Sequence, residues 1–276
     1  MADAKTKAVA TTTQGAVTTG AYDYGEYAGM GMDKVGKDEL LIPFLAILQP
    51  MSPVVTEGDN DRAKPGRYYN SITGDIYDGE SGGVPFQLVD FHRMFIEWIP
   101  RESGGGIAGR YQPDDQYVKD AIEANKGSVV GIKLDNGNDL VETYYAYGNI
   151  LSEDLTQVES FAVLPLKSTN IKPFRTLLTA LRMIKGKPPL FAFTVRLLAS
   201  KEKNDSGLWY QFRASPTGRD WRESQIDPGA SRHLLEAAVS LMEMISSGAA
   251  KADFANEGKV AGGAGANGGD DGEVPF

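Results

Sequence analysis

Aromatic and cationic side chains alternate in one short stretch of the chain, Leu208–Arg213. If this stretch is a β-strand, its alternation puts Trp209 and Arg213 on one face and the apolar side chains on the other. The preceding strand of the expected hairpin then leaves Thr194 and Arg196 on the face of the tryptophan. A tryptophan flanked by guanidinium groups offers a flat surface to an unpaired base and cations to the phosphates on either side. This arrangement predicts binding of a single-stranded nucleic acid.

Positive charge gathers around this stretch, although the chain of 276 residues has a formal net charge of −9. The window from Lys167 to Arg222 holds 12 basic and 3 acidic residues, so it carries +9 and the rest of the chain carries −18. Such segregation lets one face bind a polyanion while the acidic remainder repels non-specific contacts. The candidate DNA-binding residues are Lys172, Arg175, Arg182, Lys185, Lys187, Arg196, Lys201, Lys203, Trp209, Arg213, Arg219, Trp221 and Arg222.

A purely structural interpretation competes with this one. A tryptophan in a strand is more often a core residue than a stacking platform, and a basic hairpin is often only a solvated surface. A second aromatic and cationic face is expected in the strand that begins at Pro85, where Phe91, Arg93 and Phe95 alternate with apolar residues. Packing beneath a helix would explain those two phenylalanines equally well.

The residue types needed for most catalytic and metal sites are scarce. The chain has no cysteine and two histidines, His92 and His233, far apart in the sequence. It contains neither a Gly-x-x-x-x-Gly-Lys-Ser/Thr phosphate loop, nor His-Glu-x-x-His, nor Gly-x-Ser-x-Gly. We therefore expect no enzyme, no catalytic residue, no metal ligand and no cofactor.

The apolar pattern divides the chain into three regions. We expect a disordered arm over residues 1–36, a folded domain over 37–247, and a flexible linker with an acidic tail over 248–276. No apolar run is long enough for a membrane span, and the N-terminus lacks the apolar core of a secretory signal. These observations predict a soluble, cytoplasmic protein with no membrane partner.

Within the folded region the pattern is mainly β, with three interrupting helices, so the expected class is α+β. Strands are expected at 67–72, 85–99, 128–134, 144–151, 158–167, 190–200 and 208–214, and helices at 114–126, 173–185 and 227–248. The last helix is expected to begin with Asp227 as its N-cap and Pro228 in its first turn. This element order is that of an oligonucleotide-binding (OB) barrel with extra helices, although antiparallel sandwiches can produce it too.

The last residues combine carboxylates with one compact apolar anchor. Asp270, Asp271, Glu273 and the terminal carboxylate surround the sequence Val274-Pro275-Phe276, which follows a glycine-rich stretch. Proline reduces the entropy lost on docking, and the phenyl ring can fill a pocket while the acids meet basic residues around it. The tail is therefore expected to be bound by a partner protein.

This ending resembles the C-terminal tip of bacterial and phage single-stranded DNA-binding proteins. Asp270, Asp271, Val274, Pro275 and Phe276 match the pattern, whereas Gly272 and Glu273 replace what is commonly a third acid and a spacer. The match covers seven residues, and the long domain with its Leu-Ile-Pro-Phe-Leu-Ala-Ile-Leu-Gln segment (41–49) looks more like a divergent phage-encoded member. The resemblance implies an OB-fold, sequence-independent coating of single-stranded DNA, and recruitment of replication, recombination and repair proteins through the tail.

We therefore expect a non-enzymatic single-stranded DNA-binding protein that protects DNA during replication and recombination. The first alternative is a mediator of single-strand annealing, and the second is a non-catalytic phage structural or interaction protein. A third alternative, an unrecognised hydrolase, would require a metal-binding cluster of carboxylates. The oligomeric state and the preference for DNA over RNA do not follow from the sequence, and a homo-oligomer stays open.

Overall fold

The computed structural model describes residues 40–58, 60–205, 207–248, 251–254 and 256–257. The chain divides into two units, Met1–Gly36 and Lys37–Phe276, and every described residue belongs to the second. The expected N-terminal arm and the acidic tip lie outside the described residues. Everything below concerns the second unit.

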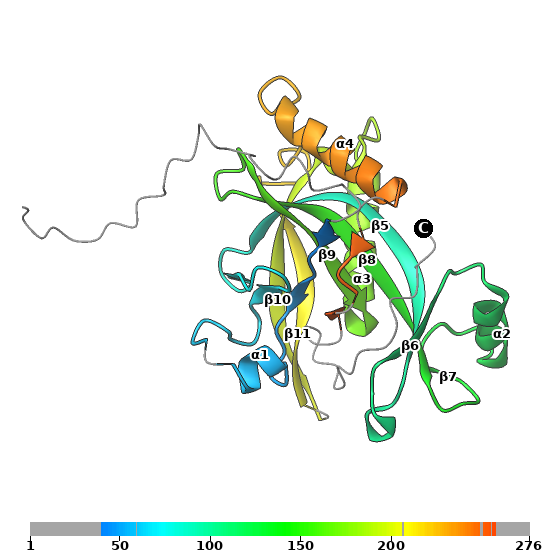
Figure 1. Ribbon diagram of the computed structural model, residues 1–276. Coiled ribbons are helices and arrows are strands. Elements are labelled where there is room, and N and C mark those ends of the chain that lie inside the picture. The colour runs from blue at the N-terminus through cyan, green and yellow to red at the C-terminus, as the bar shows by residue number, and fades with distance from the viewer. Residues whose placement is uncertain (1–39, 59, 206, 249–250, 255, 258–276) are drawn as a thin grey trace, which may run out of the picture. The chain divides into compact units, whose positions relative to one another are not determined.

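Two long antiparallel strands, β5 (Val84–Trp98) and β8 (Asp139–Leu151), form the centre of a seven-stranded sheet (Figure 1). The strand order is β11-β10-β5-β8-β7, with β6 also paired to β5 and β9 also paired to β8. The other strands of this sheet are β6 (Ile107–Tyr111), β7 (Ile132–Lys133), β9 (Val158–Lys167), β10 (Thr194–Asn204) and β11 (Gly207–Pro216).

Smaller elements surround this sheet. A three-stranded sheet is made of β2 (Leu45–Ile47), β3 (Tyr68–Asn70) and β4 (Ile76–Tyr77), and β1 (Leu41–Ile42) pairs in parallel with β12 (Lys251–Ala252). Short helical turns are α1 (Pro53–Thr56), η4 (Arg101–Ser103), η5 (Ser168–Asn170) and η6 (Leu190–Ala192).

Two helices cover opposite faces of the main sheet. Successive residues of a strand point to opposite faces, so neighbouring residues of β8 belong to different cores. Tyr144 and Ala146 of β8 belong to a first core with α3 (Ile171–Arg182), which buries Phe174, Leu177 and Leu181. Tyr145 and Tyr147 belong to a second core with α4 (Arg232–Ser246), which buries Ala238, Leu241 and Ile245. Figure 1 shows α4 lying across the sheet near β5.

A smaller cluster closes one end of β5 and β8. Phe95, Ile132 and Leu140 pack there against Val118 of α2 (Gln116–Ala124), and Figure 1 places this helix beside β6 and β7. The expected helix over 114–126 is thus present in shortened form. Phe95 is fully buried, so the expected Phe91 and Phe95 face serves packing, and Phe91 lies edge-on to Phe174 beneath α3.

The segment from Pro43 to Gln49 spans the gap between the two sheet edges β9 and β11. On one side, the Val163 N–H of β9 donates to the Pro43 carbonyl at 2.9 Å. On the other side, the Gln49 side chain forms hydrogen bonds with the backbone of Tyr210 in β11. The described strands do not form a closed barrel, because side-chain bonds rather than a continuous ladder join β11 to this segment.

The fold is therefore mainly β with helices, as expected for the α+β class. The final helix begins at Arg232, not at Asp227. Asp227 instead accepts a hydrogen bond from the Gly229 N–H at 2.8 Å, because Pro228 and Gly229 form a turn ahead of the helix. The strands β1, β2, β4, β6 and β12 were not expected, and each of them has five residues or fewer.

Described residues beyond residue 247, within the expected linker, also pack against the domain. Ala252, Asp253 and Glu257 are buried, and the Phe254 ring lies edge-on to Phe44 and Tyr145. Glycines and alanines around this segment gave it the composition of a linker, whereas its apolar and acidic side chains have specific partners in the domain.

Candidate nucleic-acid interface

The expected alternation of β10 and β11 is confirmed by the register of their pairing. Glu202 lies opposite Trp209, Ser200 opposite Gln211, and Leu198 opposite Arg213, so these residues share one face. The other face carries the buried side chains of the first core, among them Val195, Leu197, Tyr210 and Phe212. The predicted tryptophan and arginines thus lie outside the core.

Helix α3 begins directly against the edge strand β11. The turn η5 before it presents Asn170, whose Oδ1 accepts a hydrogen bond from the Phe212 N–H at 2.8 Å. The Thr169 carbonyl accepts another from Gln211 Nε2 at 2.6 Å. These two bonds fix the first turn of α3 beside the edge of the sheet, and three hollows open around that turn.

The first hollow lies between β9, β2 and β11 and has a volume of about 510 Å³. Its walls are mostly apolar, with Leu45, Leu166 and Leu208 among them, and Trp209 and Asn170 line it as well. Trp209 is half-buried, and its indole Nε1 is buried without a hydrogen-bond partner among the described residues. Such a site suits a flat, partly apolar group.

The second and third hollows flank α3 and have volumes of about 620 and 410 Å³. Lys172, Thr176 and Ala180 line both of them. Arg175 and Glu142 line the second, and Arg213, Gln211 and Trp221 line the third. Ser168 of η5 lines both the first and the second hollow, so the three hollows lie next to one another around η5 and the start of α3.

The structure therefore gathers five of the predicted site residues and separates the others. Lys172, Arg175, Trp209, Arg213 and Trp221 line the three hollows. Arg182 ends α3, Lys185 and Lys187 follow it, and Lys201 and Lys203 lie near the tip of the β10–β11 hairpin; all five are exposed and are not among the residues that line those hollows. Arg219 and Arg222 lie in the exposed loop after β11, on either side of Trp221.

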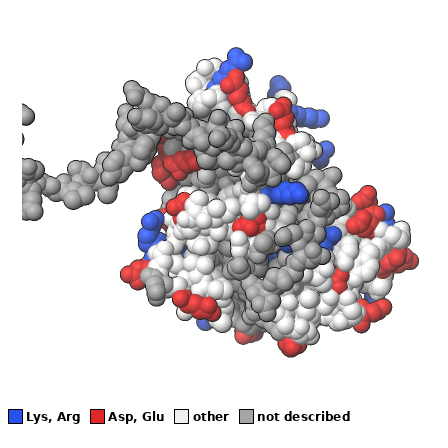
Figure 2. Space-filling model, viewed as in Figure 1, with Lys and Arg blue, Asp and Glu red and all other residues white. Residues whose placement is uncertain are grey.

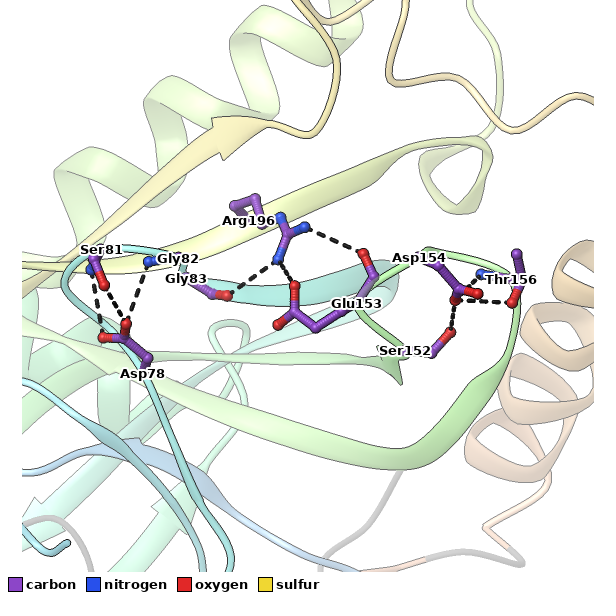
Figure 3. A network of polar contacts seen from close by, with 9 residues as sticks. All are labelled: Asp78, Ser81, Gly82, Gly83, Ser152, Glu153, Asp154, Thr156 and Arg196. Carbon is purple, nitrogen blue, oxygen red and sulfur yellow. Dashed lines mark hydrogen bonds and ion pairs between the residues drawn. The ribbon is translucent and has the colours of Figure 1, made fainter.

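Four of the predicted arginines are paired with carboxylates. Arg175 pairs with Glu142 at 2.6 Å, Arg213 with Glu202 at 3.0 Å and Arg219 with Glu223 at 2.6 Å. Arg196 pairs with Glu153 at 2.6 Å and also donates to the Gly83 carbonyl, which draws it toward the loops drawn in Figure 3. The formal charge of the window thus overstates the positive charge that it presents.

In the loops beside Arg196, the carboxylates of Asp78 and Asp154 accept hydrogen bonds from groups of their own loop (Figure 3). The Ser81 hydroxyl and the N–H groups of Glu80, Ser81 and Gly82 donate to Asp78, and these bonds lower the pKa of Asp78 to about 2. Asp154 accepts bonds from the Ser152 and Thr156 hydroxyls, which lower its pKa as well. Both carboxylates are committed to turn geometry, so we assign them no functional role.

The face of the molecule in Figure 2 shows acidic and basic side chains interspersed over its described surface. Among the described residues, no group of three or more His, Asp or Glu side chains is placed to hold a metal ion. The described helices include none that is long and apolar enough to cross a membrane.

Two residues that matter at this interface were not among the predicted DNA-binding residues. Arg93 of β5 bonds to Glu142, which lines the second hollow, and Gln49 borders the first hollow while it holds β11. The alternation of Phe91, Arg93 and Phe95 indicated a special face of β5, but its partner α3 lies about 80 residues further along the chain, and no local pattern links them.

One family model matches the chain. Residues 11–251 match the family described as Pam3 phage gp34-like protein. Neither the curated proteins nor the solved structures contain a significant match.

Proposed function

We propose that this chain, which belongs to the Pam3 phage gp34-like protein family, is a phage-encoded, non-enzymatic protein that binds single-stranded DNA along the hollows around α3. The observation that carries the proposal is the gathering of Trp209, Trp221, Lys172, Arg175 and Arg213 around one helix. Indole rings can stack on unpaired bases, and the cations between them can contact the phosphates. The other predicted basic residues of the window from Lys167 to Arg222 would add a weaker, long-range electrostatic attraction to the DNA.

The bridging of the β9 and β11 edges by residues 43–49 supports an OB-like interpretation of the fold. In such folds a curved sheet presents single strands with a groove that combines cations and aromatic rings. The acidic tip, Asp270–Phe276, would then recruit replication and repair proteins of the host cytoplasm. The annealing of complementary strands is a variant of the same function and would require the same interface.

A titration of fluorescent oligo-dT with the full chain tests this proposal. We expect binding at low salt that weakens steeply as salt rises, because the displaced counterions oppose association. Equal affinity for oligomers of different base sequence and weaker binding of duplex DNA are also expected. Absence of binding at micromolar protein concentration and low salt would overturn the proposal. Annealing of two complementary oligonucleotides by the bound protein would identify the mediator variant.

A non-catalytic structural or interaction protein is the second candidate. The observation that favours it is the pairing of Arg175 and Arg196 with Glu142 and Glu153, two carboxylates from outside the basic window. If these pairs neutralise the interface, the oligo-dT titration stays silent while the tail still binds a partner protein. The same experiment therefore separates the two candidates.

A further inference from the structure

Two arginines from different elements share one carboxylate oxygen of Glu142. Arg93 Nε of β5 and Arg175 Nη2 of α3 lie 2.7 and 2.6 Å from Glu142 Oε1. The glutamate is only 4% exposed, whereas the side chains of Arg93 and Arg175 are 36% and 49% exposed. One negative charge therefore faces two positive charges, and the excess positive charge lies on the solvent side.

Neighbouring aromatic rings hold both guanidinium groups in place. Arg175 donates through Nε and Nη2 to the Tyr144 hydroxyl at 3.2 and 3.0 Å, and this bond together with Glu142 raises the pKa of Arg175. The guanidinium carbon of Arg93 lies 5.3 Å from the centre of the Phe95 ring. Within the described part of the chain, Arg93 Nη1 and Nη2 and Arg175 Nη1 have no hydrogen-bond acceptor. Fixed guanidinium groups with free donors are suited to an anion with several oxygens.

The second hollow opens beside this pair. Arg175 and Glu142 line it, and so do Lys172, the Ser168 side chain and the hydroxyl-bearing Thr176. Lys172 and Thr176 continue into the third hollow, where Arg213 and Trp221 lie. An anion bound at the arginine pair would thus be followed by further cations and an indole ring, as a nucleic-acid backbone requires.

We infer that Arg93 and Arg175 form a subsite for the phosphodiester backbone, and that Glu142 holds the two guanidinium groups in position for DNA. This inference rests on the proposed function and adds Arg93 and Glu142 to it. A bound phosphate would accept hydrogen bonds from the free donors while Glu142 keeps its own. The carboxylate therefore positions the arginines, and at the same time it repels the incoming phosphate.

The two roles of Glu142 make its substitution informative. In Glu142→Gln the repelling charge is gone and the arginines remain, so oligo-dT binding should tighten by roughly threefold to tenfold at low salt. In Arg93→Gln binding should weaken, and the slope of log K against log salt should become shallower by about 0.7, the value for one lost phosphate contact on a single strand. If the cluster serves only to hold α3 on the sheet, both variants lower the melting temperature and the affinity of the folded variants stays unchanged.

The exposed pair Arg232–Glu236 of α4 provides matched controls, since its atoms are 2.8 Å apart and α4 covers the other face of the sheet. Arg232→Gln and Glu236→Gln change the net charge by the same amounts and should leave the affinity within about twofold, because an exposed charge at a distance is screened. Melting curves of all four variants show whether each is folded at the temperature of the titration.

The outcomes separate this inference from the proposed function. Oligo-dT binding by the unsubstituted protein with unchanged affinity and salt slope in Arg93→Gln overturns the phosphodiester subsite and leaves the proposed function standing. Weaker binding by a folded Glu142→Gln variant overturns the claim that repulsion of the phosphate by Glu142 outweighs its positioning of the arginines. Absence of binding by the unsubstituted protein overturns both proposals.

Discussion

The side chain of Gln49 pairs with Tyr210 as the backbone of a neighbouring strand would. Its Nε2 donates to the Tyr210 carbonyl at 2.9 Å, and its Oε1 accepts from the Tyr210 N–H at 2.8 Å. Asn170 Oδ1 also accepts a hydrogen bond, at 2.8 Å, from the Phe212 N–H. Two amide side chains therefore occupy three backbone groups of β11, the Tyr210 N–H and carbonyl and the Phe212 N–H, which would otherwise be open to pairing with another chain. On the other edge, Pro165 of β9 has no N–H to offer.

Replacement of Gln49 should loosen this edge. In Gln49→Ala the Tyr210 N–H and carbonyl lose their partners in a half-buried setting, and we expect a loss of about 1–2 kcal/mol in the free energy of unfolding. Urea denaturation measures this loss, and amide exchange at Tyr210 should accelerate. Gln157→Ala is the matched control, because Gln157 is exposed and its side chain has no hydrogen-bond partner among the described residues. Equal stability of the two variants would contradict the pairing role.

The buried carboxylate of Glu97, near the end of β5, predicts that the stability of the fold decreases in acid. Glu97 is 4% exposed and accepts hydrogen bonds from the Tyr111 and Tyr117 hydroxyls and from the side-chain amides of Asn136 and Asn138. Burial acts to raise the pKa of Glu97, but the four hydrogen bonds outweigh burial and lower the pKa below its ordinary value of 4.5. The ionised form is thus the one that stabilises the fold.

The sign of the pH dependence follows from that lowered pKa. The stabilisation is complete above pH 4.5 and is lost as the pH falls through the lower pKa of the folded state. Glu97→Gln should cost about 2–4 kcal/mol at neutral pH, since the amide presents donors to donors. It should also flatten the stability profile below pH 4.5. Urea denaturation from pH 3 to 7 checks both points, with the exposed Glu123→Gln of α2 as the control. A profile of equal steepness in Glu97→Gln would contradict the assignment.

Local pattern predicted much of the fold and little of the site's detail. The alternation of Trp209 and Arg213 with apolar residues fixed the faces of β11, because a strand has a period of two residues whatever lies around it. The pairing of Glu142 with Arg175 and Arg93 depends on which elements pack together in the fold, and contacts across 33 and 49 residues of sequence leave no periodic signal. The window from Lys167 to Arg222 does hold an excess of basic residues. Carboxylates from elsewhere in the chain, such as Glu153, pair with some of them and reduce the positive charge that the folded protein presents there.

Trp209 should contribute to DNA binding through its ring rather than through the stability of the fold. Trp209→Ala removes the stacking surface in the first hollow, and we expect the dissociation constant for oligo-dT to rise about tenfold, within the range of 1–3 kcal/mol for one stacked base. Trp209→Phe keeps a ring and should recover part of that loss. If Trp209 is only a packing residue, Trp209→Ala lowers the melting temperature and leaves the affinity of the folded variant unchanged.

Two truncations separate the folded domain from its tail. Glu257 is 1% exposed, accepts a hydrogen bond from the Tyr145 hydroxyl at 2.8 Å and pairs with Arg110 at 3.3 Å. The Arg110 guanidinium lies 4.5 Å from the centre of the Phe254 ring, so this segment closes over the second core. A chain that ends at residue 257 should therefore keep its melting temperature. A chain that ends at residue 250 leaves the half-buried Arg110 and the buried Tyr145 without their partner, and should lose about 3–5 kcal/mol of stability.

The shorter deletion tests the tail alone. Removal of Val274–Phe276 should leave both the melting temperature and the affinity for oligo-dT unchanged, because the expected DNA contacts are Arg93 and residues between Lys172 and Arg222. It should abolish capture of host replication or repair proteins, since the remaining acids have no apolar anchor for a pocket. Capture assays with full-length and shortened chains compare the two properties directly. Capture that survives the loss of the three residues would show that the partner binds elsewhere, and lost oligo-dT affinity would place the tip within the DNA site.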